Sequence, residues 1–332
     1  MTPLALALTL VSAAPEPALI VPQVDWLEIT SLVDNTYDCF QPDDAVAHRH
    51  SLAHVDGFDS ISLRSEMGLA FLVRYGVGEA THEIVFDFGL TEEALAGNLD
   101  RLGLSLARVE ALVLSHAHED HYAGLAWTVA HTRARGAPIY VGDTDVFLER
   151  RFEAPGRSWS MGRLAREPLE AAGATIVLAG TPRVIAGGAL LSGRIPQRTP
   201  FERVPPFLRM MRGGELAQDP MTHELALGFV VKGKGLVVIT SCAHAGVVNS
   251  IDALRAASGV TRVHAVLGGM HLTSAPPAQV EATVKALVEV APDHLAPMHC
   301  TGDRAMRLLA AALPAAYIHP GTGTRYHFGS PR

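Results

Sequence analysis

The chain has 332 residues, of which 48% are apolar and 18% charged, and its formal net charge is −7 with neutral histidines. This composition is ordinary for a globular α/β protein, and a chain of this length can fold without disulfides or a structural metal. No block of Lys or Arg stands out, which argues against a nucleic-acid-binding groove. Cys39, Cys242 and Cys300 are far apart, with no C-x-x-C pair, which favours a reducing compartment over a disulfide framework.

The N-terminus contains an apolar run at residues 4–13 followed by small residues, as in a signal peptide. No Lys or Arg precedes the run, and it is too short to span a bilayer. We therefore expect residues 1–24 to be a flexible or targeting-like segment and residues 25–332 to form a single domain. The expected location is cytoplasmic, without membrane contact, and export through the apolar N-terminus is the alternative.

The first predicted elements are strands at 26–34, 68–76 and 82–89, which are rich in apolar and β-branched residues. A helix is predicted at 91–103, where an acidic first turn and a final glycine mark the two ends. The segment VEALVLS, residues 109–115, is almost continuously apolar and predicts a fully buried strand.

The middle of the chain is less regular. We predict a helix at 124–136, a short strand at 138–142 and a second helix at 143–152. Residues 153–163 and 193–222 are rich in Arg, Pro and Gly. We expect these two segments to be excursions over the mouth of a site, outside the core.

Strands and helices alternate again in the second half, without a glycine-rich linker or a short-period repeat. Alternation alone would favour a doubly wound parallel sheet. The early run of successive strands instead favours two mixed sheets packed face to face, with helices outside, in one domain of two halves. The predicted strands are 225–233, 235–241, 263–268 and 294–298, the helices are 247–257, 278–290 and 303–313, and YIHPG and TRYHF close the chain.

The strongest chemical signal is SHAHEDHYAGL, residues 115–125, directly after the buried strand. Residues two apart in an extended segment face the same side, so His116 and His118 can converge on one ion. Asp120 and His121 follow where the chain turns into a helix, and they can face a second ion. Imidazole and carboxylate suit zinc, iron or manganese. A polar surface loop is the alternative, but four such side chains within six residues favour a metal site.

This motif, after a strand that ends in FDFG, resembles the metallo-β-lactamase superfamily. The resemblance is narrower to the branch that contains the archaeal dihydropterin synthase-like proteins of methanopterin biosynthesis, and it runs from about residue 26 to the end. The segments that carry it are LVDNTYD (32–38), SEMGLAFLV (65–73), ITSCAHAGVVNSI (239–251), VLGGMHL (266–272) and APMHCTG (296–302).

The resemblance implies a four-layer αββα sandwich of two mixed sheets, with a binuclear metal centre and a metal-bound hydroxide at the edge of the sheets. By position, His116 and His118 belong to the first metal, while Asp120 and His121 belong to the second. His299 resembles the late histidine of the second site. Asp87 matches an aspartate that mainly holds the loop beneath the metals by hydrogen bonds.

Other positions stay open at this point. Most superfamily members have a bridging aspartate after a strand like GLVVITS, where this chain has Cys242, Ala243 and His244. His244 is our choice for the third ligand of the first metal. Cys242 is either a thiolate bridge or a small buried apolar residue. His271 is a ligand, a substrate contact or a hydrogen-bond partner of a ligand, and Cys300 is expected to pack beside the site.

The chain departs from the branch at two places. Met67 lies where members often read His in Glu-His-Gly, which puts the identity of the substrate in doubt. Thr222, His223 and Glu224 replace an acidic pair before LALGFVV, and we expect His223 to be a loop residue at the mouth or a spare ligand. The histidines of the insertion AHRHSLAH, namely His48, His50 and His54, are expected in a solvated loop.

The expected function is a metal-dependent hydrolase. Two divalent ions, zinc first and iron or manganese as alternatives, would activate water for attack on an ester, lactone, amide or phosphodiester. Asp120 would orient the nucleophile and accept a proton, and the partner would be a small-molecule substrate. The alternatives are a pterin-ribose-phosphate transferase like the archaeal relatives, or a non-enzymatic metal or redox sensor that uses Cys242 and Cys300.

Overall fold

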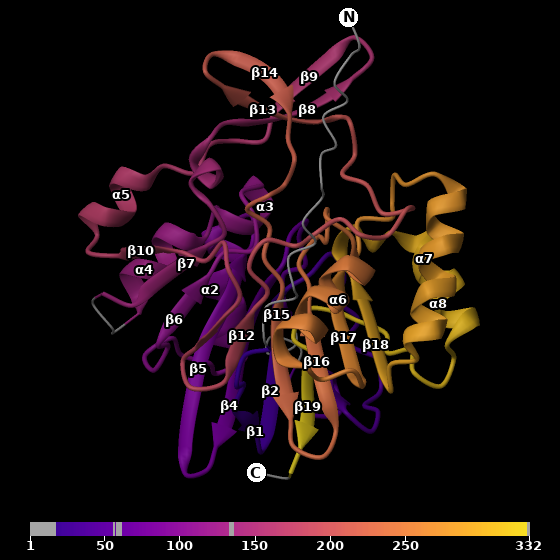
Figure 1. Cartoon of the computed structure of the whole chain (residues 1–332). Coiled ribbons are helices and arrows are strands. Elements are labelled where there is room, and N and C mark those ends of the chain that lie inside the picture. The colour runs from indigo at the N-terminus through magenta and orange to yellow at the C-terminus, as the bar shows by residue number, and fades with distance from the viewer. Residues whose placement is uncertain (1–17, 56, 58–61, 133–135, 331–332) are drawn as a thin grey trace, which may run out of the picture.

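The computed structural model describes residues 18–55, 57, 62–132 and 136–330. Two large sheets pack face to face with helices on both outer faces, and a smaller sheet stands off from one end (Figure 1). This architecture is the predicted αββα sandwich. Residues 1–17 of the predicted N-terminal segment lie outside the described part of the chain.

The first sheet is mixed and has eight strands among the described residues, in the order β10-β7-β6-β5-β4-β2-β19-β3. The neighbouring strands β5, β6, β7 and β10 run parallel to one another. The neighbours β5, β4, β2, β19 and β3 pair antiparallel. Their bounds are β2 (Trp26–Val33), β3 (Ala47–His48), β4 (Ala70–Val77), β5 (Ala80–Phe88), β6 (Ala111–Val113), β7 (Pro138–Val141), β10 (Thr175–Leu178) and β19 (Arg325–Gly329).

Four helices accompany the first sheet in sequence, and the longest begins with a side-chain cap. The Thr91 hydroxyl accepts from the amide of Ala94, which satisfies one free N–H of the first turn. Leu95 and Leu99 then pack against Leu72 and Leu112 of the sheet. The helices are α2 (Glu92–Arg101), α3 (Glu119–Tyr122), α4 (Leu125–His131) and α5 (Arg166–Ala171).

The second sheet is also mixed, with the order β11-β12-β15-β16-β17-β18 and with β1 paired to β15. The strands β16, β17 and β18 are parallel, so their carboxyl ends meet at one edge. The bounds are β1 (Gln23–Val24), β11 (Arg183–Ile185), β12 (Ala189–Leu191), β15 (Leu227–Val231), β16 (Gly235–Ile239), β17 (Val263–Gly269), β18 (His294–Met298), α6 (Val247–Ser258), α7 (Pro277–Val290) and α8 (Asp303–Ala312).

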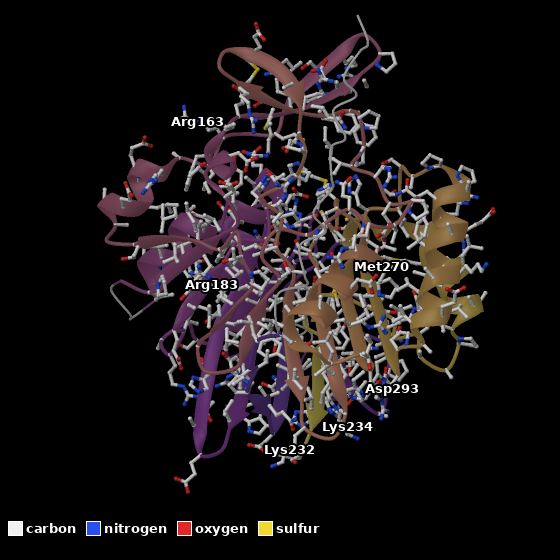
Figure 2. The ribbon with its side chains drawn as sticks, in the orientation of Figure 1. Arg163, Arg183, Lys232, Lys234, Met270 and Asp293 are labelled. Atoms are coloured by element: carbon white, nitrogen blue, oxygen red, sulfur yellow. The ribbon has the colours of Figure 1, made fainter. Side chains whose placement is uncertain are left out.

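The core between the sheets is apolar and draws on both halves of the chain. Phe71 and Phe86 of the first sheet belong to the same buried cluster as Leu227 and Phe229 of the second. The turn between β15 and β16, with Lys232 and Lys234, lies at the end of the sandwich opposite to Arg163 (Figure 2). This turn precedes β16 and His244 follows it, so the turn and the loop that carries His244 lie at opposite ends of that strand.

The smaller sheet is made of β8 (Arg150–Ala154), β9 (Arg157–Ser160), β13 (Leu208–Arg212) and β14 (Glu215–Gln218). It contains parts of both segments that we expected as excursions, but these parts are regular hairpins. The predicted helix at 143–152 is wrong. Only a short 3-10 turn, Thr144–Phe147, forms, because Arg150 is drawn into the interior, where it donates to Asp219 at 2.9 Å and starts β8.

The other helix predictions are confirmed, with ends that differ by one or two residues in all but one case. The helix predicted at 124–136 ends at His131, and residues 133–135 of that prediction lie outside the described residues. YIHPG is not a strand, and Tyr317 makes only an isolated bridge to Leu295. Among the described residues, no helix has the length and apolarity needed to cross a membrane.

Candidate metal centre

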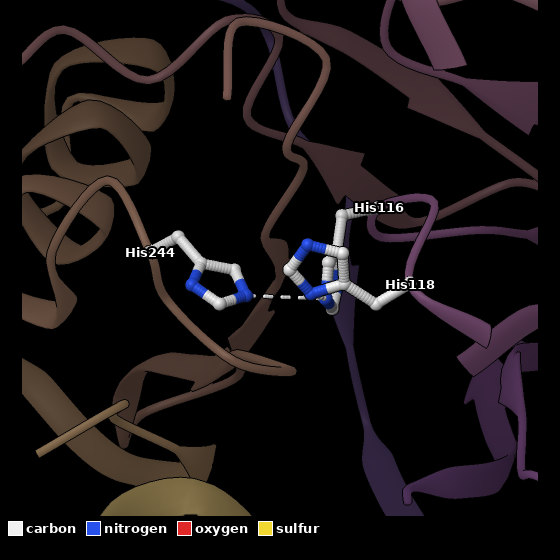
Figure 3. Close-up of side chains that lie close together, drawn as sticks. All are labelled: His116, His118 and His244. Atoms are coloured by element: carbon white, nitrogen blue, oxygen red, sulfur yellow. Dashed lines mark hydrogen bonds between the residues drawn. The ribbon is translucent and has the colours of Figure 1, made fainter. Parts of the chain in front are cut away.

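The loop after β6 brings two histidines of the motif against a third from the second sheet. The Nε2 atom of His116 lies 3.1 Å from Nδ1 of His118 and 3.3 Å from Nε2 of His244 (Figure 3). All three side chains are buried. His244 follows β16, so the group forms where the carboxyl ends of strands from both sheets meet.

The tautomer of His116 follows from its neighbours. The hydroxyl of Ser115 donates to Asp87 at 2.7 Å, because the carboxylate can only accept. That hydroxyl must therefore accept from Nδ1 of His116, 2.8 Å away. The Nε2 atom is left with a free lone pair that faces His118 and His244, as a metal ligand requires.

A second group lies beside the first. The Oδ2 atom of Asp120 is 3.4 Å from Nε2 of His121 and 3.3 Å from Nε2 of His299. The Nδ1 atom of His299 is 2.8 Å from the side-chain oxygen of Asn35, which leaves Nε2 for the cluster. The Cys242 thiol is 3.3 Å from Nε2 of His121 and is buried.

The distances within both groups fit bound cations. A tetrahedral ion with nitrogen ligands at about 2.0–2.1 Å has ligand atoms about 3.3 Å apart, which is the spacing found here. His116, His118 and His244 form one group of ligand atoms within 4.8 Å of one another, and Asp120, His121 and His299 form another. Cys242 belongs to further groups that join the two. The donor set of imidazoles, a carboxylate and a thiol suits zinc.

The electrostatics differ between the two groups. Burial, followed by the neighbouring imidazoles, holds the pKa values of His116 and His244 well below the ordinary value, so both are neutral. Burial also lowers the pKa of His121, but Asp120 and Asp87 outweigh it and raise the pKa to about 10. Conversely, His121 and His299 outweigh the burial of Asp120 and hold its pKa well below the usual range. The second group is therefore an ion pair when no cation is bound.

Asp87, at the end of β5, joins the two halves of the centre. Its carboxylate accepts from the amide of Ser115 at 2.7 Å, from the hydroxyl of Ser115, and from the hydroxyl of Ser241. Nδ1 of His121 is 2.9 Å away. One buried carboxylate thus fixes the loop after β6 and the loop after β16.

Two further carboxylates hold the late loops, and the sequence analysis assigned neither of them. Glu224 accepts from the amides of His244 at 2.7 Å and Ala245 at 2.6 Å, and burial raises its pKa to about 7. Asp34 accepts from the amide of His299 at 3.0 Å, and burial raises its pKa to about 6. Asp34 directly follows β2 and Glu224 shortly precedes β15, and an acidic residue at a strand boundary was the signal available in the sequence.

His271 lies between the cluster and a cavity. Its ring is 4.2 Å from that of His244, centroid to centroid, and neither of its ring nitrogens has a hydrogen-bond partner. With Cys242 and His244, it forms another group of possible ligand atoms. The Cys300 thiol packs against the backbone oxygen of Cys242 at 3.7 Å.

The expectation that His223 is a mouth residue is wrong, because the side chain is completely buried. Its Nδ1 atom is 3.1 Å from both Arg150 and Asp145, and its Nε2 atom is 3.4 Å from the amide nitrogen of Ala117. His223 therefore packs beneath the first histidine loop and links it to the base of the smaller sheet.

The insertion histidines lie apart from the metal groups. His48 and His54 each approach Asp43, at 3.4 and 2.9 Å, with about half of their side chains exposed. The prediction of a solvated loop is confirmed for these two residues.

Comparison with known proteins agrees with this geometry. Residues 64–187 match the model of the metallo-beta-lactamase superfamily. The chain is 27% identical over 248 residues to the 7,8-dihydropterin-6-methyl-4-(β-D-ribofuranosyl)-aminobenzene-5'-phosphate synthase of Methanocaldococcus jannaschii, covering 73% of this chain and 83% of that enzyme. An uncharacterised protein of the same organism is also 27% identical, over 72% of this chain and 86% of its own length.

Solved structures show the same fold. A metal-dependent hydrolase of the β-lactamase superfamily superposes with a TM-score of 0.71 and 22% identity, covering 92% of this chain and all of that one. A metallo-β-lactamase fold protein of Bacillus subtilis superposes with a TM-score of 0.50 and 13% identity, over 92% of this chain and all of that one. The chain therefore has the metallo-β-lactamase fold, and the resemblance to this superfamily and to the archaeal branch is confirmed.

Proposed function

We propose that this metallo-β-lactamase fold protein is a metal-dependent hydrolase that binds two divalent cations, and that zinc is the preferred metal. His116, His118 and His244 would hold one ion, and Asp120, His121 and His299 the other, with Cys242 as a shared thiolate. The observation that carries the proposal is the spacing of the ligand atoms. His116 Nε2 and Asp120 Oδ2 each lie 3.1–3.4 Å from two partners, and all ligand atoms of a group lie within 4.8 Å of one another. The free lone pair on Nε2 of His116 faces ring nitrogens of His118 and His244, an arrangement that a shared cation would explain.

Divalent ions bound in this way would lower the pKa of a bound water and polarise an ester, lactone, amide or phosphodiester. The residues around the ions would orient the attacking water and the ligand side chains. Asp120 has a partly accessible carboxylate in an otherwise buried cluster, so it is placed to orient the attacking water and to accept a proton. Asp87 and Ser115 hold the imidazoles of His121 and His116 in the tautomers that expose Nε2.

The test combines metal analysis with turnover. Purified protein reconstituted with zinc should hold close to two ions per chain and hydrolyse at least one class in a panel of chromogenic esters, lactones and phosphodiesters. Asp120→Ala should lower metal content and reduce the rate by about 100-fold or more. The matched control is Glu119→Ala, which removes the exposed neighbouring carboxylate and should change neither.

Full metal content and turnover in Asp120→Ala would refute the role of this residue. Protein that holds no transition metal after reconstitution would refute the metal centre. Metal binding without any hydrolysis, together with thiol-dependent redox of the bound metal, would instead favour a sensor.

The similarity to the archaeal synthase supports a second candidate, a transferase that acts on a pterin and a ribose-phosphate compound. The same metal centre would serve it. The discriminating assay follows formation of the product named for that enzyme, by mass spectrometry, alongside the hydrolase panel. Product formation without ester or phosphodiester hydrolysis would replace the hydrolase proposal.

A further inference from the structure

A cavity of about 460 Å³ opens beside the metal centre. One wall is the segment 202–207, with Val204, Pro206 and Phe207, and the opposite wall is formed by residues after β17 and at the start of α7, with Met270 and Leu272 among them. Its volume lies in the range of small-molecule sites. Most of its lining is apolar, unlike the histidine cluster next to it.

The cavity is continuous with the cluster, because His244 and His271 line both. A single substrate molecule could therefore place one group in the cavity and its reacting bond at the proposed cations. The buried nitrogens of His271 have no hydrogen-bond partner, and an unpaired buried polar group costs free energy until something pairs with it. This end of the cavity suits a polar atom of a ligand.

The wall formed by α7 also carries a buried polar group that has no hydrogen-bond partner. Thr283, on α7, is completely buried, and its hydroxyl also has no hydrogen-bond partner.

The charged residues on the wall are already engaged. The carboxylate of Glu202 accepts from the amides of Val248 and Asn249, each at 2.8 Å. The guanidinium of Arg203 donates to the backbone oxygens of Thr199 at 2.7 Å and Glu202 at 3.0 Å. The carboxylate of Glu202 is therefore engaged within the wall, and Arg203 is an exposed residue of the lining. An uncharged substituent suits the buried, mainly apolar part of the cavity.

We propose that this cavity holds an uncharged, mainly apolar group of the substrate, and specifically the acyl chain of a carboxylic ester, lactone or amide. The inference rests on the proposed hydrolase function and narrows its substrate class. The carbonyl end lies beside His244 and His271, and the chain runs along Phe207 and Leu272 towards Thr283. Burial of apolar area along this path supplies binding energy that a short acyl group cannot gain.

The test measures binding without turnover, by isothermal titration calorimetry of zinc-loaded protein with straight-chain carboxylates from acetate to decanoate. Each added methylene buried in an apolar site contributes about 0.8 kcal/mol, which is about a fourfold gain in affinity. We expect the affinity to rise by this factor per methylene and then to level off when the cavity is full.

Ala275→Trp places a large side chain on the lining of the cavity and should abolish the gain with chain length while leaving acetate binding unchanged. The matched control is Ala311→Trp on the exposed surface of α8, which should keep the gain. Equal affinities for acetate and octanoate in the unmodified protein would overturn the proposal, as would a gain that survives Ala275→Trp.

Thr283→Val provides an independent variant that changes only one buried hydroxyl. It should raise the affinity for octanoate by about threefold and leave acetate unchanged, because a methyl group replaces an unpaired polar group. No change for octanoate would count against the path along α7. Since the readout is a ratio between chain lengths, it separates failure of this inference from failure of hydrolysis or of metal binding.

Discussion

The ligand loops from the two halves of the chain are built differently. The early loop places His116, His118, Asp120 and His121 within six residues, and none of them has a positive φ. The two late candidate ligands come from separate loops with strained backbone, since Ala243 next to His244 has a φ of 55° and His299 has a φ of 47°. Left-handed backbone at non-glycine residues costs about 1–2 kcal/mol each.

The difference shows where the centre depends on tertiary contacts. The early loop continues directly from a buried strand, and a short helix begins within it. Each late loop has a buried carboxylate of its own that accepts from the amide of the histidine itself, Glu224 for His244 and Asp34 for His299, whereas Asp87 is shared between the early loop and the loop after β16. Strain at a functional site persists only where surrounding structure enforces it. The late loops are therefore the part of the centre that mutation should loosen selectively.

Asp87→Ala should disorder the early loop and the loop after β16 together, and it should lower the free energy of unfolding more than any other variant proposed. It removes the acceptor for Ser115, His121 and Ser241 in a buried place, so we expect a loss of about 3–5 kcal/mol in unfolding free energy and loss of both metals. Urea unfolding and metal analysis would measure this. Asp100→Ala, at an exposed position on α2, is the control, and equal effects from both variants would contradict the central role of Asp87.

Glu224→Gln should loosen the late loop alone. An amide oxygen and an NH2 group cannot accept from both amides of His244 and Ala245, so one buried N–H loses its partner. We expect affinity for one of the two ions to fall by about 10–100-fold, while the other ion is retained. Titration against a chelator measures both ions, with Glu110→Gln at the exposed pair with His82 as control. Equal loss of both ions would argue against two separately supported groups.

Cys242→Ser tests how the two groups are joined. If the thiolate is a ligand, the cobalt-substituted protein should show thiolate-to-metal charge-transfer absorption that the variant lacks. Metal affinity should also fall by about tenfold, or 1.4 kcal/mol. Cys39→Ser, in a loop outside the metal groups, should keep the spectrum. Identical spectra for the unmodified protein and Cys242→Ser would make Cys242 a packing residue.

Ala243→Gly should give the smallest effect, and in the stabilising direction. Glycine adopts a positive φ without the steric penalty that alanine pays at 55°. We expect the free energy of unfolding of the metal-free protein to rise by about 1 kcal/mol. Ala245→Gly, where φ is not positive, should lower it by about 0.5–1 kcal/mol, and stabilisation of both or neither would refute strain in this loop.

The sequence was most informative where a pattern is local. Apolar runs and helix-end signals predicted the main strands and helices, because periodicity and capping act within a few residues. They did not predict the hairpins of the smaller sheet. The partner strands β8 and β13 are separated by 53 residues between Ala154 and Leu208. Arg150, at the start of β8, contacts Asp219 and His223 far along the chain in addition to nearby backbone oxygens.

The candidate metal-binding motif of the early loop can be recognised from the sequence alone, since its four candidate ligands are neighbours and follow a buried strand. The resemblance to a known family then indicated His299. His244 was the choice at a position where the family has an aspartate, because histidine is the commonest metal ligand. Only the tertiary structure shows that Glu224 and Asp34 hold the late loops. It also shows that His223 is buried against the amide of Ala117 and that His271 lines a cavity. The physical reason is that a buried polar side chain must find partners wherever the fold brings them, and those partners leave no periodic trace in the sequence.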